Sequence, residues 1–212
     1  IANTPAEHVW WHREADALVV EADIRDAVIF GRKLTLHRTL TFPTGENAIL
    51  LTDTIENHGD EASPVMVLYH MNMGYPLLSE KAEVVIPSCK VTPRDARAAE
   101  DLDTHLTMLP PTPGFVEQCY FHEFEKIGEA KIFSPDAGVG LRISFDPQNL
   151  DCFCQWKMMG VHDYVLGLEP GNCTPDGRDV MRRTGKLKFL APGEHVRYHV
   201  RVDFYDDYAA WA

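Results

Sequence analysis

Hydrophobic and polar residues alternate along much of this chain, and this alternation is the pattern of half-buried β-strands. In the clearest case, residues 196–204, every even position is apolar and every odd position is polar. Residues 34–42 repeat the pattern, largely with leucine against threonine. Further candidate strands lie at 10–11, 18–24, 49–55, 65–69, 84–86, 116–124, 131–133, 139–145, 152–158, 163–172 and 187–190. So many short strands predict an all-β protein, an antiparallel sandwich or barrel, with one domain over residues 1–212.

Two segments refine this prediction. The candidate strand 49–55 precedes the turn cluster Asn57-His58-Gly59-Asp60, and the next strand, 65–69, is apolar on both faces. This order predicts a hairpin whose second strand is central and covered on both sides. The window from Pro93 to Thr107 is the convincing helical one, and its many charged residues predict a helix on the surface.

Composition excludes several classes of protein. The net charge of −12 over 212 residues argues against binding to nucleic acid or to an anionic membrane. No apolar run approaches the roughly 18 residues of a membrane span, and no signal-peptide pattern opens the chain. The cysteines number five and show no CxxC pair, so we expect free thiols and a cytoplasmic location. Because the chain begins with Ile1 rather than Met, we also expect an incomplete domain, with an exposed sheet edge or apolar face near Trp10 and Trp11.

The segment 163–172 carries the most informative carboxylate. In a strand, Gly167 and Glu169 share one face, and Pro170-Gly171 then ends the strand. A glycine on that face leaves room beside Glu169 for a ligand. A carboxylate among apolar neighbours is a candidate general base, although a solvated glutamate at a strand end is the more common case.

His70 shows a related pattern at the end of the candidate strand 65–69. Asn72 follows on the same face, before Gly74 and Pro76 interrupt the strand. Histidine is the natural general acid near neutral pH, whereas a core histidine bonded to a carbonyl is the plainer alternative.

Other residues are candidates for binding rather than for proton transfer. Trp156 could form a platform for the apolar face of a sugar ring, or simply belong to the core. His122 is polar among aromatic residues, and Arg178 follows Glu169 after a turn-rich segment. The ten histidines show no HxH, HExxH or HxxxH pair on a helix, so we expect no metal ion. The candidate substrate-binding residues are Asn72, His122, Gln155, Trp156 and Arg178.

Three segments, in this order, resemble the galactose mutarotase (aldose 1-epimerase) superfamily. They are residues 47–74, which end in Leu-Tyr-His-Met-Asn-Met-Gly, residues 167–172, which read Gly-Leu-Glu-Pro-Gly-Asn, and residues 190–194, which read Leu-Ala-Pro-Gly-Glu. The amino-acid sequence of these segments is most similar to the branch known as DUF4432. The resemblance implies an antiparallel β-supersandwich that lacks its N-terminal strands in this chain. For the aspartate with which other members hold the sugar, Gln155, Trp156 and Asp163 are the candidates.

The resemblance also implies a function. Glu169 would be the general base and His70 the general acid of an isomerase that interconverts sugar anomers, with no cofactor. We expect the two groups to face one cleft, on the order of 5–9 Å apart, by analogy with catalytic pairs that flank a pyranose. The alternative is a non-catalytic sugar-binding module of the same fold. The expected partner is a small sugar, and the oligomeric state stays open, with a homodimer as one option.

Overall fold

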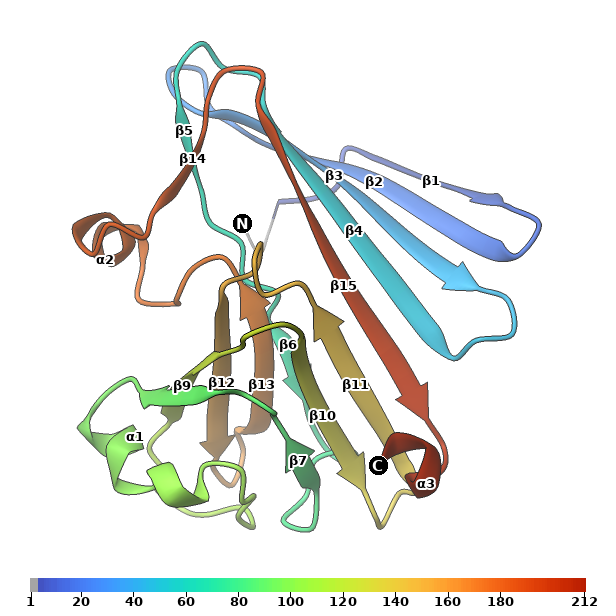
Figure 1. Cartoon of the computed structure of the whole chain (residues 1–212), viewed down its shortest axis with the longest axis vertical. Coiled ribbons are helices and arrows are strands. Elements are labelled where there is room, and N and C mark those ends of the chain that lie inside the picture. Colours follow the sequence, from blue (N-terminus) through green and yellow to red (C-terminus); the bar gives the residue numbers. More distant parts are fainter. Residues whose placement is uncertain (1–3) are drawn as a thin grey trace. The chain divides into compact units, whose positions relative to one another are not determined.

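The computed structural model describes residues 4–212, and its regular structure consists mainly of antiparallel strands (Figure 1). Its residues fall into two compact units. The first comprises Ile1–Met66 and Arg178–Val202, and the second comprises Val67–Gly177 and Asp203–Ala212. The predicted all-β antiparallel fold is confirmed.

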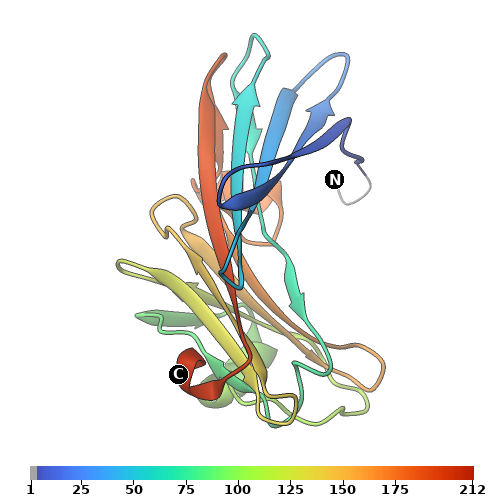
Figure 2. The same cartoon turned by 90° about the vertical axis from the view of Figure 1, so that its right-hand side faces the viewer.

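The first unit is a sheet of long strands. It contains, in spatial order, β1 (His8–Arg13), β2 (Ala17–Ala27), β3 (Lys33–Pro43), β4 (Ala48–Asn57) and β15 (His195–Tyr205), whose last residues belong to the second unit. Figure 2 shows the first four side by side. A short ladder joins β5 (Ser63–Val65) to β14 (Lys188–Leu190), and α2 (Arg178–Arg183) completes the unit.

The second unit holds the sheet that matters most for function. Its order is β6 (Met71–Met73), β13 (Tyr164–Gly171), β12 (Cys152–Met159), β9 (Gln118–Glu123) and β8 (Lys90–Pro93). Three more strands pair with one another: β7 (Glu83–Val85), β10 (Gly128–Ser134) and β11 (Val139–Phe145). The helical elements are α1 (Ala96–Glu100), the 3-10 turn η1 (Leu102–Thr104) and α3 (Tyr208–Trp211).

The alternating patterns located most strands well. The predicted strand at 139–145 has the same bounds as β11, and 196–204 lies within β15. The hairpin of 49–55 with 65–69 is wrong: β4 pairs with β3, and β5 ends at Val65. Beyond it the backbone bonds to the end of β13, because Tyr69 N donates to Pro170 O and Val67 N donates to the side chain of Asn172. His70 therefore lies just before β6 and does not end a strand.

The helical window from Pro93 to Thr107 is only partly helical. α1 and η1 occupy its middle, and Pro93 belongs to β8. Asp95 caps α1 by accepting a hydrogen bond from Ala98 N at 3.0 Å, so the side chain that begins the helix also separates it from the strand.

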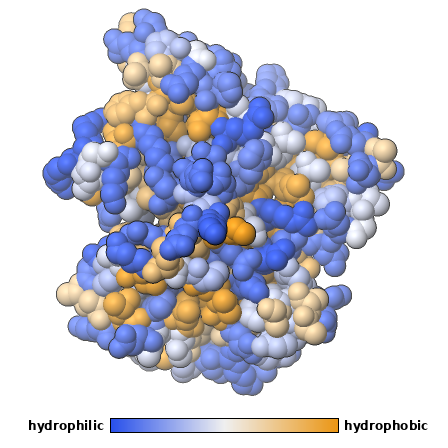
Figure 3. Space-filling model, viewed as in Figure 1, coloured by the Kyte–Doolittle hydropathy of each residue, from blue (hydrophilic) through white to orange (hydrophobic). Residues whose placement is uncertain are grey.

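Apolar side chains are unevenly exposed. β1 lies at one end of its sheet and is exposed along its whole length, with Trp11 69% exposed, so the exposed edge expected there is present. The Ile1 end of that expectation lies outside the described residues. Figure 3 shows apolar residues on one face of the molecule in several patches between hydrophilic ones. No helix within residues 4–212 is long and apolar enough to cross a membrane.

Candidate functional site

The register of β6, β13, β12 and β9 decides which candidate residues meet. Gly167 lies opposite Asn72 on one side and Trp156 on the other, and Trp156 lies opposite Cys119. Leu168 pairs with Met71 and Gly171 pairs with Leu68, so His70 comes next to Glu169. Side chains opposite one another in a ladder share a face. One face therefore carries His70, Asn72, Trp156, Gly167 and Glu169.

His70 and Glu169 are in direct contact. Nε2 of His70 lies 3.1 Å from Oε1 of Glu169. The expected separation of a sugar ring's width is therefore wrong. The reason is the register: the two residues are neighbours on adjacent strands, where side chains on one face meet directly.

The two members of this pair differ sharply in exposure. The side chain of Glu169 is 2% exposed, whereas that of His70 is 49% exposed. Burial raises the pKa of Glu169 from 4.5 to about 7, because the ionised carboxylate is poorly solvated there. Oε1 makes no hydrogen bond, since the ring nitrogen of His70 is close enough for an ion pair but not aligned with it. A buried, poorly satisfied carboxyl that titrates near neutrality is typical of functional sites.

Two further side chains hold the ring of His70. Nδ1 lies 2.9 Å from Oδ1 of Asn72, and because a carbonyl oxygen only accepts, Nδ1 carries a proton. In the neutral ring the lone pair is then on Nε2, the nitrogen nearest to Glu169; in the charged ring Nε2 also carries a proton. The ring also packs against the indole of Trp156 in a T-shaped arrangement, with the ring centroids 5.5 Å apart and the planes at 69°.

Gly167 is necessary for the position of the carboxylate. A Cβ atom on Gly167 would lie 2.2 Å from Oε1 of Glu169 and 3.1 Å from Cβ of Trp156. The sequence predicted that this glycine leaves room for a ligand. The room is taken by the carboxylate of Glu169 itself.

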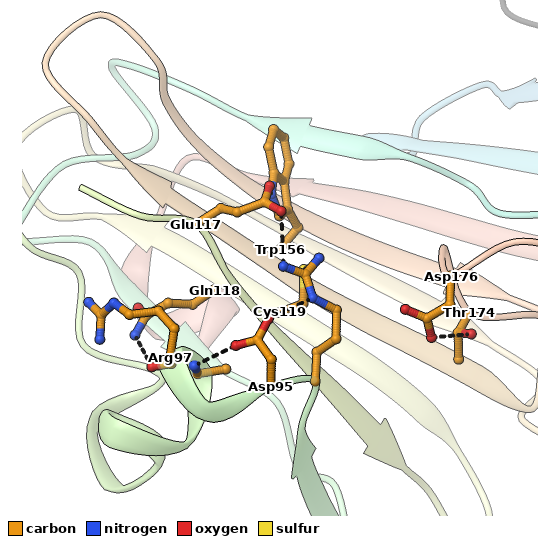
Figure 4. A network of polar contacts seen from close by, with 10 residues as sticks. Asp95, Arg97, Glu117, Gln118, Cys119, Trp156, Thr174 and Asp176 are labelled. Atoms are coloured by element: carbon orange, nitrogen blue, oxygen red, sulfur yellow. Dashed lines mark hydrogen bonds and ion pairs between the residues drawn. The ribbon is translucent and has the colours of Figure 1, made fainter. Parts of the chain in front are cut away.

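A polar network anchors the indole nitrogen of Trp156 (Figure 4). Its Nε1 donates to Oε2 of Glu117 at 2.7 Å, and Nη2 of Arg94 donates to the other oxygen of Glu117 at 2.9 Å. The hydrogen bond from Trp156, with that from Arg94, holds the pKa of Glu117 below its usual value. This carboxylate therefore stays ionised while Glu169 titrates.

His122 and Gln155 are not brought to this site. Their positions in the ladders place them on the opposite face of the sheet, and both are buried. There Nε2 of His122 lies 3.2 Å from Oε1 of Gln155, and Nδ1 lies 2.9 Å from the hydroxyl of Ser88. Burial lowers the pKa of His122 to about 4, so this ring is neutral at pH 7 and belongs to the interior of the unit.

The remaining predictions have simpler outcomes. Arg178 begins α2 in the first unit and is exposed, and its role in binding a sugar stays a prediction. Within residues 4–212, no group of three or more His, Cys, Asp or Glu side chains is arranged to hold a metal ion. None of the cysteines forms a disulfide in the described part of the chain.

Sequence reasoning missed Glu117 and Arg94. The sequence gives one weak indication of Glu117: it lies two positions before Cys119 in the predicted strand, so both side chains should lie on the same face. Its bond to Trp156, however, joins residues 39 positions apart and depends on the register of two strands. A one-residue slip would send the glutamate to the other face.

Solved structures resemble this chain over nearly its whole length. A "putative aldose 1-epimerase" from Klebsiella pneumoniae matches with a TM-score of 0.91 and 25% identity over 98% of this chain. The match covers 56% of that protein, so this chain spans little more than half of its length. Two galactose mutarotase-like proteins share the fold. The one from Clostridium acetobutylicum matches with a TM-score of 0.69 and 15% identity, over 93% of this chain and 65% of that one. The one from Lactobacillus casei matches with a TM-score of 0.62 and 16% identity, over 93% of this chain and 73% of that one.

The family comparison agrees with the structural one. A search of curated proteins finds no significant match. Residues 1–204 match the family described as a domain of unknown function, DUF4432. Since this match covers nearly the whole chain, the protein belongs to the DUF4432 family, and its fold is that of the galactose mutarotase-like proteins.

Proposed function

We propose that this protein is an isomerase of the aldose 1-epimerase type, which interconverts the anomers of a sugar by opening and closing its ring. One observation carries the proposal: the contact between His70 and Glu169, with the pKa of the carboxyl near 7. The resemblance of the Klebsiella protein, which bears that name, supports the same reaction class.

The short distance between the two groups suits this chemistry. Ring opening of a cyclic sugar requires removal of the proton from the anomeric hydroxyl and addition of a proton to the ring oxygen. Both oxygens are bonded to the same carbon, so an acid and a base in contact can reach them together. Enzymes that cleave glycosidic bonds instead flank the sugar with carboxyls about 5–9.5 Å apart. The 3.1 Å contact therefore favours a reaction at two oxygens of one carbon, as in ring opening, over cleavage of a glycosidic bond.

The roles of the two groups follow from their surroundings. Glu169, as the carboxylate, takes the proton of the anomeric hydroxyl, and Nε2 of His70, as the imidazolium, donates to the ring oxygen. After rotation about the C1–C2 bond, the same two groups return the protons in reverse on the other face of the carbonyl. Because His70 is 49% exposed and Glu169 only 2%, the sugar would approach from the side of His70, and its anomeric oxygens would have to enter between the two groups and widen their contact.

The test is polarimetry with the wild-type protein and a panel of freshly dissolved single anomers of aldoses. The proposal requires that optical rotation relax faster than in buffer for at least one sugar. Calorimetry on the same panel identifies the alternative: a sugar that binds but relaxes at the spontaneous rate indicates a binding module without turnover. The sugar that is accelerated, and its preferred anomer, come from the same measurement.

A further inference from the structure

We propose that Glu117 and Arg94 are positioning residues, which fix the indole of Trp156 and, through it, the imidazole of His70 against Glu169. The inference adds to the proposed function and relies on it only for the kinetic part of its test. The side chain of His70 is 49% exposed, so burial does not fix its ring, and contacts with particular neighbours must do so.

The restraint on His70 comes from three neighbours. Asn72 holds Nδ1, Glu169 faces Nε2, and Trp156 forms a T-shaped aromatic pair with the ring. The first two act at the nitrogen atoms, in the plane of the ring. Trp156 is the aromatic neighbour of the ring, with the centroids 5.5 Å apart, and this contact restricts the ring only if the indole is itself fixed.

Glu117 fixes this indole at its polar end. The bond from Nε1 to Oε2 of Glu117 is short, at 2.7 Å, and a hydrogen bond to an ionised acceptor is stronger than one between neutral groups. The other oxygen of Glu117 is occupied by Arg94 at 2.9 Å. With both oxygens engaged, Glu117 serves as a fixed acceptor for protein groups.

Arg94 is in turn held at each of its nitrogen atoms. Nε donates to Oδ2 of Asp95 at 3.0 Å, Nη1 to Sγ of Cys119 at 3.0 Å, and Nη2 to Glu117. Asp95 caps α1 through its second oxygen. A continuous chain of contacts therefore leads from the start of α1 through Arg94, Glu117 and Trp156 to His70, part of which is drawn in Figure 4.

The test compares Glu117→Ala with Glu123→Ala. Glu123 lies on β9, six residues further along and hence on the same face, and it also binds a basic residue of β8, Lys90, at 2.6 Å. Among the described residues the Glu123 carboxylate bonds to Lys90 and not to Trp156, so this variant controls for loss of an acidic side chain and an ion pair. The first readout is the ¹⁵N spectrum of the imidazole and indole groups, with His70 and Trp156 assigned from His70→Asn and Trp156→Phe.

The expected result is that Glu117→Ala shifts the Trp156 indole resonance and the His70 ring resonances, while Glu123→Ala moves neither. Glu117→Gln keeps an oxygen acceptor for the indole and should restore most of the wild-type spectrum. If Glu117→Ala is poorly folded, Trp156→Phe, which keeps an aromatic ring but loses the indole donor to Glu117, decides the question. Unmoved His70 resonances in Glu117→Ala and Trp156→Phe would overturn the proposal.

Kinetics supply the second readout once a converted sugar is known. Misplacement of His70 should lower kcat roughly 10- to 100-fold in Glu117→Ala, with KM changed less than about threefold. The double variant Glu117→Ala/Trp156→Phe should lose no more than either single one, because both break the same anchor. A large rise in KM with unchanged kcat would overturn the proposal and show that Glu117 binds the sugar directly. If the wild type converts no sugar, the proposed function fails, while the spectra still decide the positioning role.

Discussion

Glu169 should make the stability of the protein depend on pH in an unusual direction. Burial raises the pKa of this carboxyl from 4.5 to about 7, so the folded protein holds its proton over a pH range in which the unfolded chain has lost it. Because the folded state binds more protons, the free energy of unfolding falls as pH rises through this window. The contribution is fully present below about pH 4.5 and is lost above about pH 7.

The size of the effect follows from the same values. A rise from 4.5 to about 7 corresponds to about 3 kcal/mol, at 1.36 kcal/mol per pH unit. The side chain is 2% exposed, so screening by solvent removes little of this energy. Glu169→Gln has the same shape and no charge. Its free energy of unfolding should therefore exceed that of the wild type at pH 8, by at most about 3 kcal/mol, and approach it at pH 4.5.

The assay is urea unfolding of both proteins at a series of pH values from 4.5 to 8. The difference in free energy of unfolding, plotted against pH, should rise between about pH 5 and pH 7 and then level off. Glu123→Gln, in which the lost carboxylate is 57% exposed, controls for removal of a charge from the same unit. A difference that stays constant with pH, or a Glu169→Gln protein less stable than the wild type at pH 8, would refute the reasoning.

Two further predictions concern the same unit. Gly167→Ala puts a Cβ atom 2.2 Å from Oε1 of Glu169 and should therefore displace the carboxylate. We expect this variant to be less stable than the wild type by about 1–3 kcal/mol and to have lower turnover. Gly74→Ala is the control: no atom lies within 4 Å of the added carbon, so neither stability nor turnover should fall. Denaturation and polarimetry of both variants check this. Lys157 is 2% exposed, and burial lowers its pKa from 10.5 to about 8. As pH rises, the folded protein therefore loses this proton before the unfolded chain does. The free energy of unfolding of the wild type should rise between about pH 8 and pH 10 as a result. Lys157→Met should lose that rise, whereas Lys90→Met at an exposed position should keep it; equal slopes in Lys157→Met and the wild type would contradict the prediction.

The fold and the two central residues of the site could be predicted from the sequence, because both depend on local patterns. Alternation located the strands that hold Glu169 and Trp156. His70 was singled out by the family resemblance and by its place after the apolar run 65–69, although that run does not end as a strand there. The pairing of strands is a property of register, which alternation does not reveal. It decided that His70 and Glu169 touch, that His122 and Gln155 lie on the other face, and that Glu117 binds Trp156. The failed hairpin has a similar cause, since residues 67–69 bond to Pro170 and Asn172, about 100 positions away.

The central claim, that Glu169 and His70 form the acid–base pair of an anomer-converting enzyme, is tested most directly by polarimetry of three proteins. The rate at which the optical rotation of a single anomer relaxes, corrected for the spontaneous rate, is compared for the wild type, Glu169→Gln and His70→Asn, with affinity measured separately by calorimetry. General acid–base groups typically contribute about 10²–10⁴-fold. We expect Glu169→Gln to abolish the acceleration with sugar binding nearly intact, and His70→Asn to lose activity nearer the lower end of that range, because water can partly replace the acid at the ring oxygen. Wild-type activity in Glu169→Gln would contradict the account.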